Sequence, residues 1–461
     1  MSSNENILIY AIRGTDKWWD YVGKKMGSYN SFVVSDIKGK GDFDIVDDFY
    51  KGLATYQDES FDGPFLLSAA SIEEIIARCR VLRCLDPALA RAMVNAMAEA
   101  FQSALDNVNP IAILAFPIDR YVSDVLEHLA KSRGVPFYEL TASPLPGMGM
   151  LMKKGFLMAR DEDICSALVE QHLAELTKPL FAPSYVQGAS NFGLLKWIRT
   201  FLYFRLRGWT FKLISIINRD PLNLHYLDAQ SFLRHKTTLK DLKVLYLTDS
   251  DWRVKAEEFL IENRVFFGLT VFPEASIDYW INNLDLIKYE EVVLEAAKAF
   301  SKAGFLILIK DHPQQFGFRQ KDLIDKLLKI ENTVLVPYAV SGNEVLMMCG
   351  TNFSSTGTLG LQAALLGKNS VVVRNYYAQQ DSFIFFESRS EISSIPQVLS
   401  DKNLDKDLRS EQYCIIERLL RGSFSCDFFS FVNFDDKKPN ASAVELGNVL
   451  GEQIRYHQNL L

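Results

Sequence analysis

Five consecutive apolar residues, Phe305 to Ile309, constrain the fold of this chain more than any other segment. No position in this run can face water, which is the pattern of a central strand in a parallel sheet covered on both faces. Apolar residues between Leu286 and Phe300 recur with a helical period, and Gly304 follows where that helix would end. A second helix is predicted over Leu323–Ile330. The segment therefore predicts a doubly wound unit of parallel strands and helices.

The same alternation of short apolar runs and amphipathic stretches occurs in both halves of the chain. In the C-terminal half, further strands are predicted at Val265–Val271, Val334–Val336 and Ser370–Val373. In the N-terminal half, strands are predicted at Ile7–Ile12, Ser31–Ser35, Ile111–Phe116 and Gly134–Leu140. A helix over Val122–Ser132 joins the last two strands into a βαβ unit. The predicted fold class is α/β, with two Rossmann-like doubly wound domains that face each other.

Length and charge limit the organisation and the function classes. At 461 residues the chain is too long for one ordinary domain. We predict Rossmann-like domains over residues 1–185 and 243–440, a basic helical linker over 186–242, and a C-terminal helix over 441–461 that crosses back to the first domain. With 50 Lys and Arg against 57 Asp and Glu, the net charge of −7 argues against a nucleic-acid binder.

The predicted linker has its own composition. From Leu176 to Arg219 there is no acidic residue, and aromatic side chains such as Trp197 and Trp209 alternate with lysines and arginines. This pattern is typical of an amphipathic helix on an anionic membrane surface. It is equally typical of an interdomain helix whose apolar face packs on protein, because cationic side chains can cover apolar surface. Both interpretations stay open at this point.

Cysteine usage and the N-terminus predict a reducing, cytosolic location. The six cysteines are scattered without a CxxC pair, so neither a zinc site nor a disulfide framework is indicated. The polar segment Met1–Glu5 leads directly into the first strand, without the zones of a secretory signal. No run of apolar residues is long enough to span a membrane.

The strongest local signal for a binding site follows the central strand. The segment Lys310–Arg319 contains a His312-Pro313 pair between two cations, Lys310 and Arg319, which together suggest a cationic rim for a phosphate or carboxylate. Ligands of open α/β sheets bind outside the carboxyl ends of the strands, where this loop is expected. The alternative is a turn in which the histidine only satisfies a backbone carbonyl.

A second anion-binding candidate comes one α/β unit later. Ser354, Ser355, Thr356 and Gly357 precede the predicted helix Thr358–Leu366. Hydroxyls and free backbone N–H groups at a helix N-terminus attract anions. A single serine there would be an ordinary helix cap. Three hydroxyls beside glycines, next to the His312 loop, instead suggest a shared nucleotide phosphate.

Two carboxylates follow another strand of the C-terminal half. Glu274 comes directly after Pro273, and Asp278 lies one helical turn later. Glu274 is a candidate nucleophile or proton acceptor, and its alternative role is a charge that pairs with the helix dipole. Asp278 fits a supporting role better. The six histidines have no metal-ligand spacing, and Asp249-Ser250-Asp251 is interpreted as the start of a helix, so no metal site and no cofactor are predicted.

These motifs carry a resemblance to a known family. The Lys-x-His-Pro loop with its following Gly and Arg, the Pro-Glu-Ala-Ser turn and the Ser-Ser-Thr-Gly helix start resemble, in order and spacing, the donor-binding half of GT-B glycosyltransferases that make bacterial capsule and surface polysaccharides. The family includes the Kdo transferases. The His-Pro and Ser-Ser-Thr pair is also similar to that of GT-B sialyltransferases, where both bind the cytidine monophosphate of the donor. The resemblance covers about residues 265–380, and the N-terminal half matches only in overall pattern.

The resemblance implies roles for individual residues. His312 would hold the donor phosphate, and Glu274 would lie near the anomeric carbon. Ser354, Ser355 and Thr356 would close on the phosphate from the second loop, with Arg319 as a secondary contact. The acidic motif of the related sialyltransferases is missing from the first domain, which leaves Asp119 and Glu139 as candidate bases there.

The implied function is metal-independent transfer of a sugar onto a bacterial surface polysaccharide or glycolipid. The expected donor is a CMP-activated 2-keto acid sugar such as Kdo, bound by the C-terminal domain, with the acceptor on the N-terminal domain. The expected location is the cytoplasm, with the linker as a candidate contact to the inner face of the membrane. The alternatives are a transferase for UDP- or GDP-sugars, a sugar-nucleotide epimerase, and a non-enzymatic nucleotide-sugar-binding scaffold.

Overall fold

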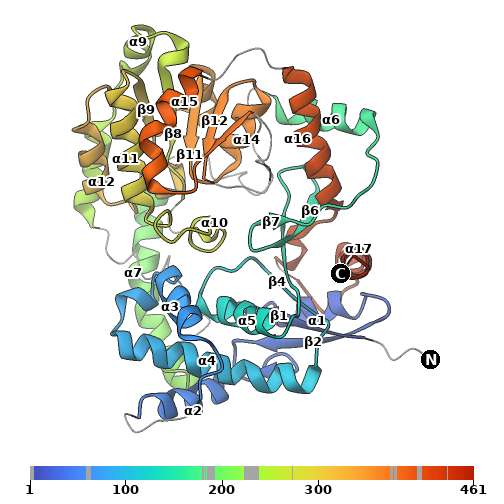
Figure 1. The fold of residues 1–461 in the computed structure, drawn as a ribbon. Helices are drawn as coiled ribbons and strands as arrows, with labels where there is room; N and C mark the ends of the chain where they lie inside the picture. The colour runs from blue at the N-terminus through green and yellow to red at the C-terminus, as the bar shows by residue number, and fades with distance from the viewer. Residues whose placement is uncertain are drawn as a thin grey trace.

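Two β-sheets with helices on both faces form the two halves of the molecule (Figure 1). The computed structural model describes residues 5–460 except 59–63, 179–180, 182, 184–192, 223–237, 272–273, 374–376, 378–381, 402–406 and 433. The predicted fold class, two Rossmann-like α/β domains, is confirmed by the strand order of both sheets.

The first sheet has the order β14-β6-β5-β4-β1-β2-β3, with β7 paired to β6. Its strands are β1 (Glu5–Ala11), β2 (Tyr29–Ser35), β3 (Phe43–Asp44), β4 (Ala112–Ala115), β5 (Phe137–Ala142), β6 (Met148–Lys153), β7 (Phe156–Leu157) and β14 (Ser423–Ser425). From β3 to β5 the strands are parallel, and β6 and β14 extend the sheet in antiparallel fashion. The strands predicted from apolar runs all lie in the parallel part.

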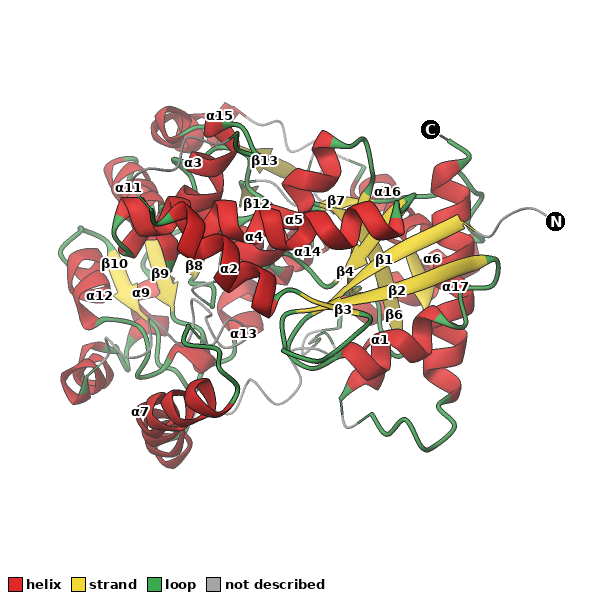
Figure 2. Cartoon of the chain, turned by 90° about the horizontal axis from the view of Figure 1, so that it is seen from below, coloured by secondary structure: helices red, strands yellow, loops and turns green. Residues whose placement is uncertain are grey.

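Strand β1 is buried on both faces, as a central parallel strand must be. Ile7 and Ile9 face a cluster formed with α1 (Asp16–Gly23) and α17 (Ala441–Gln458). Leu8 and Tyr10 face the opposite cluster, and Figure 2 shows the helices on the two sides of this sheet. The helices of the second face are α2 (Val46–Tyr56), α3 (Ala69–Arg78), α4 (Pro87–Val108) and α5 (Tyr121–Ser132).

The second sheet has the order β10-β9-β8-β11-β12-β13 and is parallel throughout. Its strands are β8 (Arg264–Gly268), β9 (Leu306–Lys310), β10 (Thr333–Leu335), β11 (Thr351–Ser354), β12 (Asn369–Val372) and β13 (Phe383–Phe385). The helices around it are α9 (Trp252–Glu257), α10 (Ala275–Asp278), α11 (Tyr289–Lys302), α12 (Lys321–Leu328), α13 (Gly342–Met347), α14 (Thr358–Leu365), α15 (Ile395–Asp401) and α16 (Leu408–Gly422). Gly304 follows α11 with a φ of +85°, which explains why this helix ends at a glycine.

Strand β11 was not predicted from the sequence. Its residues, Thr-Asn-Phe-Ser, include only one apolar side chain, yet all four are buried. The segment was interpreted as part of the loop before α14. It is a strand because it pairs with β8 on one side and β12 on the other, contacts that link residues far apart in the chain.

The domain boundaries differ from the predicted ones in two places. Helix α6 (Ser166–Leu176), expected to belong to the first domain, packs in one apolar cluster with α14 and α16 of the second half. The chain also returns to the first domain before residue 441, because β14 pairs with β6. Helix α17 then packs beside α1 (Figure 1).

The linker contains one α-helix within its described residues, α7 (Leu194–Ile217), and a 3-10 helix, Leu239–Leu247, begins before its predicted end. Trp197 near the beginning of α7 packs in the core of the second domain, and Asp220 just beyond its end accepts a hydrogen bond of 2.5 Å from Tyr50 of α2. Helix α7 therefore contacts both domains. No helix within the described ranges is long and apolar enough to cross a membrane.

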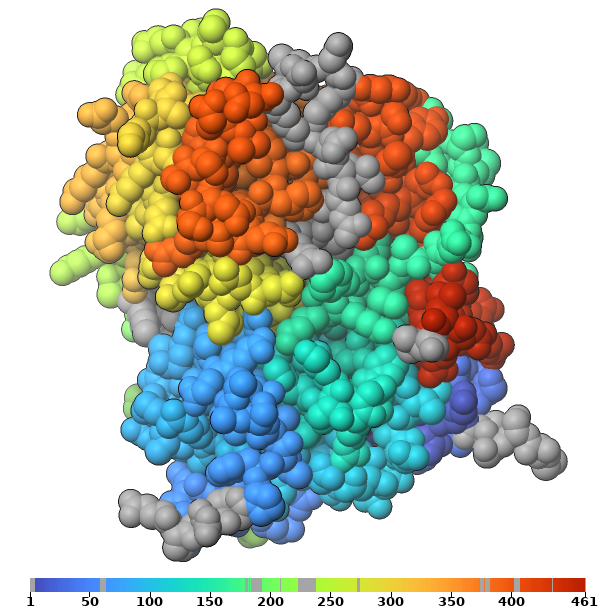
Figure 3. Space-filling model, in the orientation of Figure 1, coloured from blue at the N-terminus to red at the C-terminus, as the bar shows by residue number. Residues whose placement is uncertain are grey.

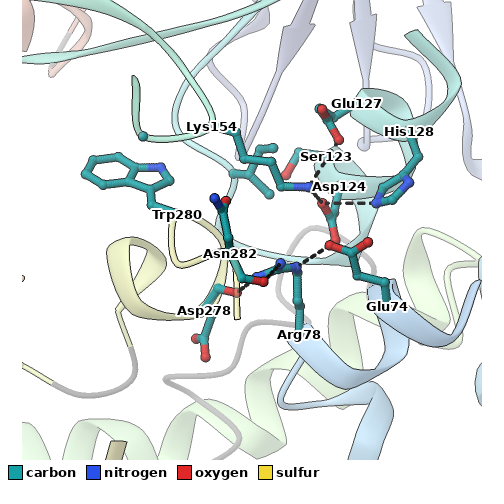
Figure 4. Close-up of polar contacts among 12 residues, drawn as sticks. Glu74, Arg78, Ser123, Asp124, Glu127, His128, Lys154, Asp278, Trp280 and Asn282 are labelled. Carbon is teal, nitrogen blue, oxygen red and sulfur yellow. Dashed lines mark hydrogen bonds and ion pairs between the residues drawn. The ribbon is translucent and has the colours of Figure 1, made fainter. Parts of the chain in front are cut away.

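Helix α10 lies between the two domains, and the first domain holds it in place (Figure 1). Arg78, the last residue of α3, donates hydrogen bonds to the carbonyl oxygens of Asp278, Ile281 and Asn282 at 2.9, 2.8 and 3.2 Å. Its Nε also donates to Glu74 at 2.8 Å (Figure 4). In Figure 3 the yellow surface around α10 rests on the blue and teal surface of the first domain.

We predict that Arg78→Met lowers the free energy of unfolding by at least about 3 kcal/mol, since three carbonyl oxygens lose their donor at about 1–3 kcal/mol each. Urea denaturation measures the loss. The matched control is Arg91→Met. Arg91 of α4 forms an ion pair of 2.8 Å with Glu73 of α3, the helix that also carries Arg78, but both side chains of this pair are more than half exposed. That variant should change stability by less than about 1 kcal/mol. Equal effects of the two variants would contradict the assigned role of Arg78.

Candidate active site

Three predicted motifs come together at the carboxyl edge of the second sheet. The His312 loop follows β9, and Glu274 follows β8. Ser354 ends β11, with Ser355 and Thr356 directly after it, and these three strands are neighbours in the order β9-β8-β11. The chain runs from β8 outward through β9 to β10 and then returns to the other side of β8. The boundary between β8 and β11 is therefore the topological switch point at which α/β sheets bind ligands.

Asp311 is the centre of the His312 loop. Its carboxylate accepts hydrogen bonds from Arg319 Nε at 2.6 Å, from the Tyr338 hydroxyl at 2.7 Å and from the His312 backbone N–H at 2.9 Å. Arg319 also donates to the carbonyl oxygen of Thr270 at 2.6 Å, which ties this loop to the end of β8. The network fixes the shape of the loop at the carboxyl edge of the sheet.

His312 is positioned as a neutral hydrogen-bond donor. Its Nδ1 accepts the backbone N–H of Gln314 at 3.2 Å, so the proton of the neutral ring lies on Nε2. Burial lowers the pKa of His312 to about 4, against the opposing charge of Asp311 and with smaller contributions in the same direction from Arg319 and Lys310. At neutral pH the ring therefore offers an N–H group and no charge.

The cations beside His312 do not form the expected open rim. Arg319 is buried and bound to Asp311 at 2.6 Å, so its charge is already compensated. Lys310 is also buried, its Nζ donates to the carbonyl oxygen of Tyr338 at 3.2 Å, and burial lowers its pKa to about 8. Both cations support the loop from inside. Pro313 begins the short 3-10 helix that follows His312.

The serine loop contacts the segment that carries Glu274. The hydroxyls of Thr356 and Ser276 lie 2.8 Å apart and are both buried. Gly357, with a φ of +127°, joins β11 to α14 in a backbone conformation that side chains other than glycine rarely adopt. Tyr377 donates a hydrogen bond to the Gly357 carbonyl oxygen and so holds this turn.

One buried hydroxyl at the switch point has no hydrogen-bond partner within the described part of the chain. The Oγ of Ser355 is buried without a hydrogen bond, whereas the hydroxyl of the nearby Thr270 shares one with Tyr289. Ser355 follows β11 and Thr270 follows β8, so the two lie at the ends of paired strands. Buried polar atoms in native proteins are nearly always satisfied, and an unsatisfied one requires an explanation. A ligand with acceptor oxygens would supply it.

Glu274 stands at the N-cap position of α10 but does not cap the helix with its side chain. It shares a hydrogen bond with Ser276, and its carboxyl group lies close enough to Arg80 and Asp278 to feel their charges. Burial raises the pKa of Glu274 to about 7, so the carboxyl group can exchange a proton at neutral pH. Pro273, expected to present it, lies outside the described residues.

Asp278 is paired with an arginine that the sequence analysis did not consider. Nε of Arg80 donates to Oδ1 of Asp278 at 2.8 Å, and both side chains are buried. Burial raises the pKa of Asp278 to about 6. The pair fixes α10 on the first domain, which fits the supporting role expected for Asp278. No local signal could identify Arg80, because it precedes its partner by nearly two hundred residues.

Two carboxylates of the first domain were candidate bases, and the structure places them in different surroundings. Asp119 lies in the loop after β4, where it forms an ion pair of 2.6 Å with Arg13. Glu139 is buried in β5, accepts the backbone N–H of Ile118 at 2.8 Å, and has a pKa raised by burial to about 7. Trp280, two residues beyond Asp278, donates to it at 3.4 Å. Of the two, Glu139 therefore reaches the second domain.

A cluster on α5 contains the one group of metal-ligand types found among the described residues. Atoms of Asp124, Glu127 and His128 lie within 4.8 Å of one another. Figure 4 shows Lys154 directed into this cluster, with its Nζ 3.4 Å from Asp124 and 3.2 Å from Glu127. The ammonium group already supplies the positive charge that the two carboxylates need.

We predict that Asp311→Asn destabilises the protein by about 3–5 kcal/mol, because it leaves the buried charge of Arg319 without a counter-ion. The control is Tyr338→Phe, which removes one neutral donor from the same carboxylate and should cost about 0.5–1.5 kcal/mol. Chemical denaturation of both variants measures the difference. A cost for Asp311→Asn no larger than that of the control would mean that this network does not hold the loop.

Comparisons with known proteins find similar structures at low sequence identity. The sequence matches no protein-family model and no curated protein. Among solved structures, the β-Kdo 2,7-transferase KpsC of Thermosulfurimonas dismutans has 12% identity and a TM-score of 0.36, covering 97% of this chain and 99% of that chain. A glycosyltransferase of Rickettsia africae has 11% identity and a TM-score of 0.29, with 99% of each chain covered. The UDP-GlcNAc 2-epimerase of Methanocaldococcus jannaschii, solved with UDP-GlcNAc and UDP, has 11% identity and a TM-score of 0.27, covering 90% of this chain and 98% of that chain. At these values the fold assignment rests on the strand order of this chain itself.

Proposed function

We propose that this protein is a metal-independent glycosyltransferase of the GT-B type. Its donor would be a nucleotide sugar, a CMP-activated 2-keto acid sugar such as Kdo, and its acceptor a bacterial surface polysaccharide or glycolipid, as in capsule synthesis. The choice of CMP rests on the resemblance of the His312-Pro313 and Ser354-Ser355-Thr356 motifs. The alternatives are a UDP- or GDP-sugar transferase, a sugar-nucleotide epimerase and a nucleotide-sugar-binding scaffold.

The observation that carries the proposal is the buried, unpartnered hydroxyl of Ser355 at the switch point. It supplies a donor for an anion without a competing partner in the described residues. His312 adds a neutral N–H donor from the neighbouring strand, and the N-terminus of α14 adds the positive end of a helix dipole. These groups suit the phosphate of a nucleotide sugar. That phosphate is bound as part of the donor and is released on the nucleotide after transfer, when it carries one more negative charge.

Glu274 is the proposed catalytic carboxylate. In its ionised form it would stabilise the positive charge that develops at the anomeric carbon, or attack that carbon. Its hydrogen-bonded neighbour Ser276 contacts Thr356, which links the carboxyl group to the proposed phosphate site. Asp119 and Glu139 remain the candidates for an acceptor base on the first domain. Glu139 is favoured by its contact with Trp280.

We predict that CMP stabilises the protein against thermal unfolding more than UDP or GDP. At about 100 times the dissociation constant, a ligand that binds only the folded state adds about 2.7 kcal/mol. A thermal-shift series with the three nucleotides at equal concentration measures this. A larger shift with UDP or GDP would reject the CMP-linked donor and favour one of the alternatives.

His312→Ala should weaken CMP binding by about 1.5–3 kcal/mol, the usual value of a hydrogen bond to a charged group. His312→Gln retains an N–H donor and should lose less. Isothermal titration of both variants gives the affinities. Unchanged CMP affinity in His312→Ala would leave the histidine with only its structural contact to Gln314.

Glu274→Gln should abolish transfer while CMP affinity and stability stay near those of the native protein, because the charge acts mainly in the transition state. In the native enzyme kcat should rise with pH through about 7, since the ionised form is active and the pKa of Glu274 is about 7. Adding a chelator should leave the rate unchanged. The control is Glu262→Gln, an exposed carboxylate at the opposite end of β8. Near-native transfer by Glu274→Gln would show that this carboxylate is not catalytic.

A further inference from the structure

Helix α7 has two apolar faces, and only one of them packs on the protein. On the inner face Trp197 and Phe204 are buried, with ring centroids 6.2 Å from Phe316 and 5.8 Å from Phe318 respectively. A Cβ atom added at Gly317 would lie 1.1 Å from Trp197 Nε1, so the helix lies directly on this loop. The packing interpretation of the linker is therefore correct for this face.

The outer face of α7 is a continuous exposed apolar stripe. Its side chains recur at intervals of three, four or seven residues, which places them along one side of a helix. Leu195 is 83% exposed and Trp209 is 74% exposed. We call this set the outer stripe: Leu195, Leu202, Leu206, Trp209, Leu213 and Ile216. Contiguous apolar surface of this kind on a soluble domain marks an interaction site.

Charge identifies the partner of the outer stripe. The helix carries five cations and no acidic residue, and four of the cations, Lys196, Arg199, Arg205 and Lys212, are exposed. A protein interface of average composition would place both signs of charge around its apolar centre. Cations alone beside an apolar stripe complement a surface with anionic headgroups above a hydrocarbon layer.

We propose that α7 lies in the plane of an anionic lipid bilayer, with the outer stripe inserted into the interface and the cations at the lipid phosphates. The inner face then connects the bilayer to the His312 loop through Phe316 and Phe318. Asp220 beyond the end of the helix is bound to Tyr50 of the first domain, so both domains are held at the same surface. This proposal is independent of the identity of the donor.

The test uses the full chain with vesicles of phosphatidylcholine alone or mixed with an equal part of phosphatidylglycerol. We expect co-sedimentation with the mixed vesicles at ~10 mM salt and much less at ~1 M salt, where the Debye length falls from about 30 Å to about 3 Å. Trp209 is the most exposed of the described tryptophans, so its emission should shift to shorter wavelength on binding. The shift should be missing in Trp209→Phe.

Substitutions distinguish insertion of the apolar side chains into the bilayer from electrostatic attraction between the cations and the lipid phosphates. Leu206→Ser with Leu213→Ser should weaken partitioning by at least about tenfold, and Arg199→Gln or Lys212→Gln by roughly fivefold each. Tyr246→Ser removes an exposed apolar side chain outside α7 and should have no effect. All variants should retain the thermal shift with CMP, so failure of membrane binding is distinguishable from failure of the proposed function.

Absence of binding to anionic vesicles at low salt would overturn the proposal. So would a lipid-free dimer that the two serine substitutions convert to a monomer, because the stripe would then be a self-interface.

Discussion

The buried contact between α10 and the first domain is the interaction on which the rest of the site depends. Arg80 neutralises Asp278 at 2.8 Å, and Arg78 binds three carbonyl oxygens at the end of the same short helix. A helix of four residues has little stability of its own, so these two arginines decide where it lies. Glu274 directly precedes this helix at the N-cap position, so its position is fixed by both domains together.

Burial also decides the chemical character of the candidate site at the switch point. Around His312 the charges cancel inside the protein, because Arg319 pairs with Asp311 and Lys310 is capped by a carbonyl oxygen. What remains toward the switch point are neutral donors and a carboxyl group whose pKa lies near 7. In the proposed function, such a site would bind a phosphate through preorganised dipoles, which need no rearrangement when charge moves during a reaction.

The two faces of α7 connect the candidate site to the proposed membrane surface. The helix is apolar on both sides, so its pattern does not show the simple amphipathic stripe of an ordinary surface helix. The inner face of α7 packs on Phe316 and Phe318, which belong to the His312 loop itself. A glycolipid acceptor anchored in the bilayer would then lie at a fixed distance from the donor site. A soluble acceptor would not need this arrangement.

The sequence by itself determined the elements that local pattern can specify. Apolar runs such as Phe305–Ile309 and helical stripes such as that of α11 located most of the central parallel strands, several of the helices and the three motifs at the strand ends. Tertiary structure alone decided that polar β11 is a central strand, that Arg319 is bound by Asp311, and that Arg80 reaches Asp278. The physical reason is that burial of a polar residue depends on its partner, and these partners come from distant parts of the chain.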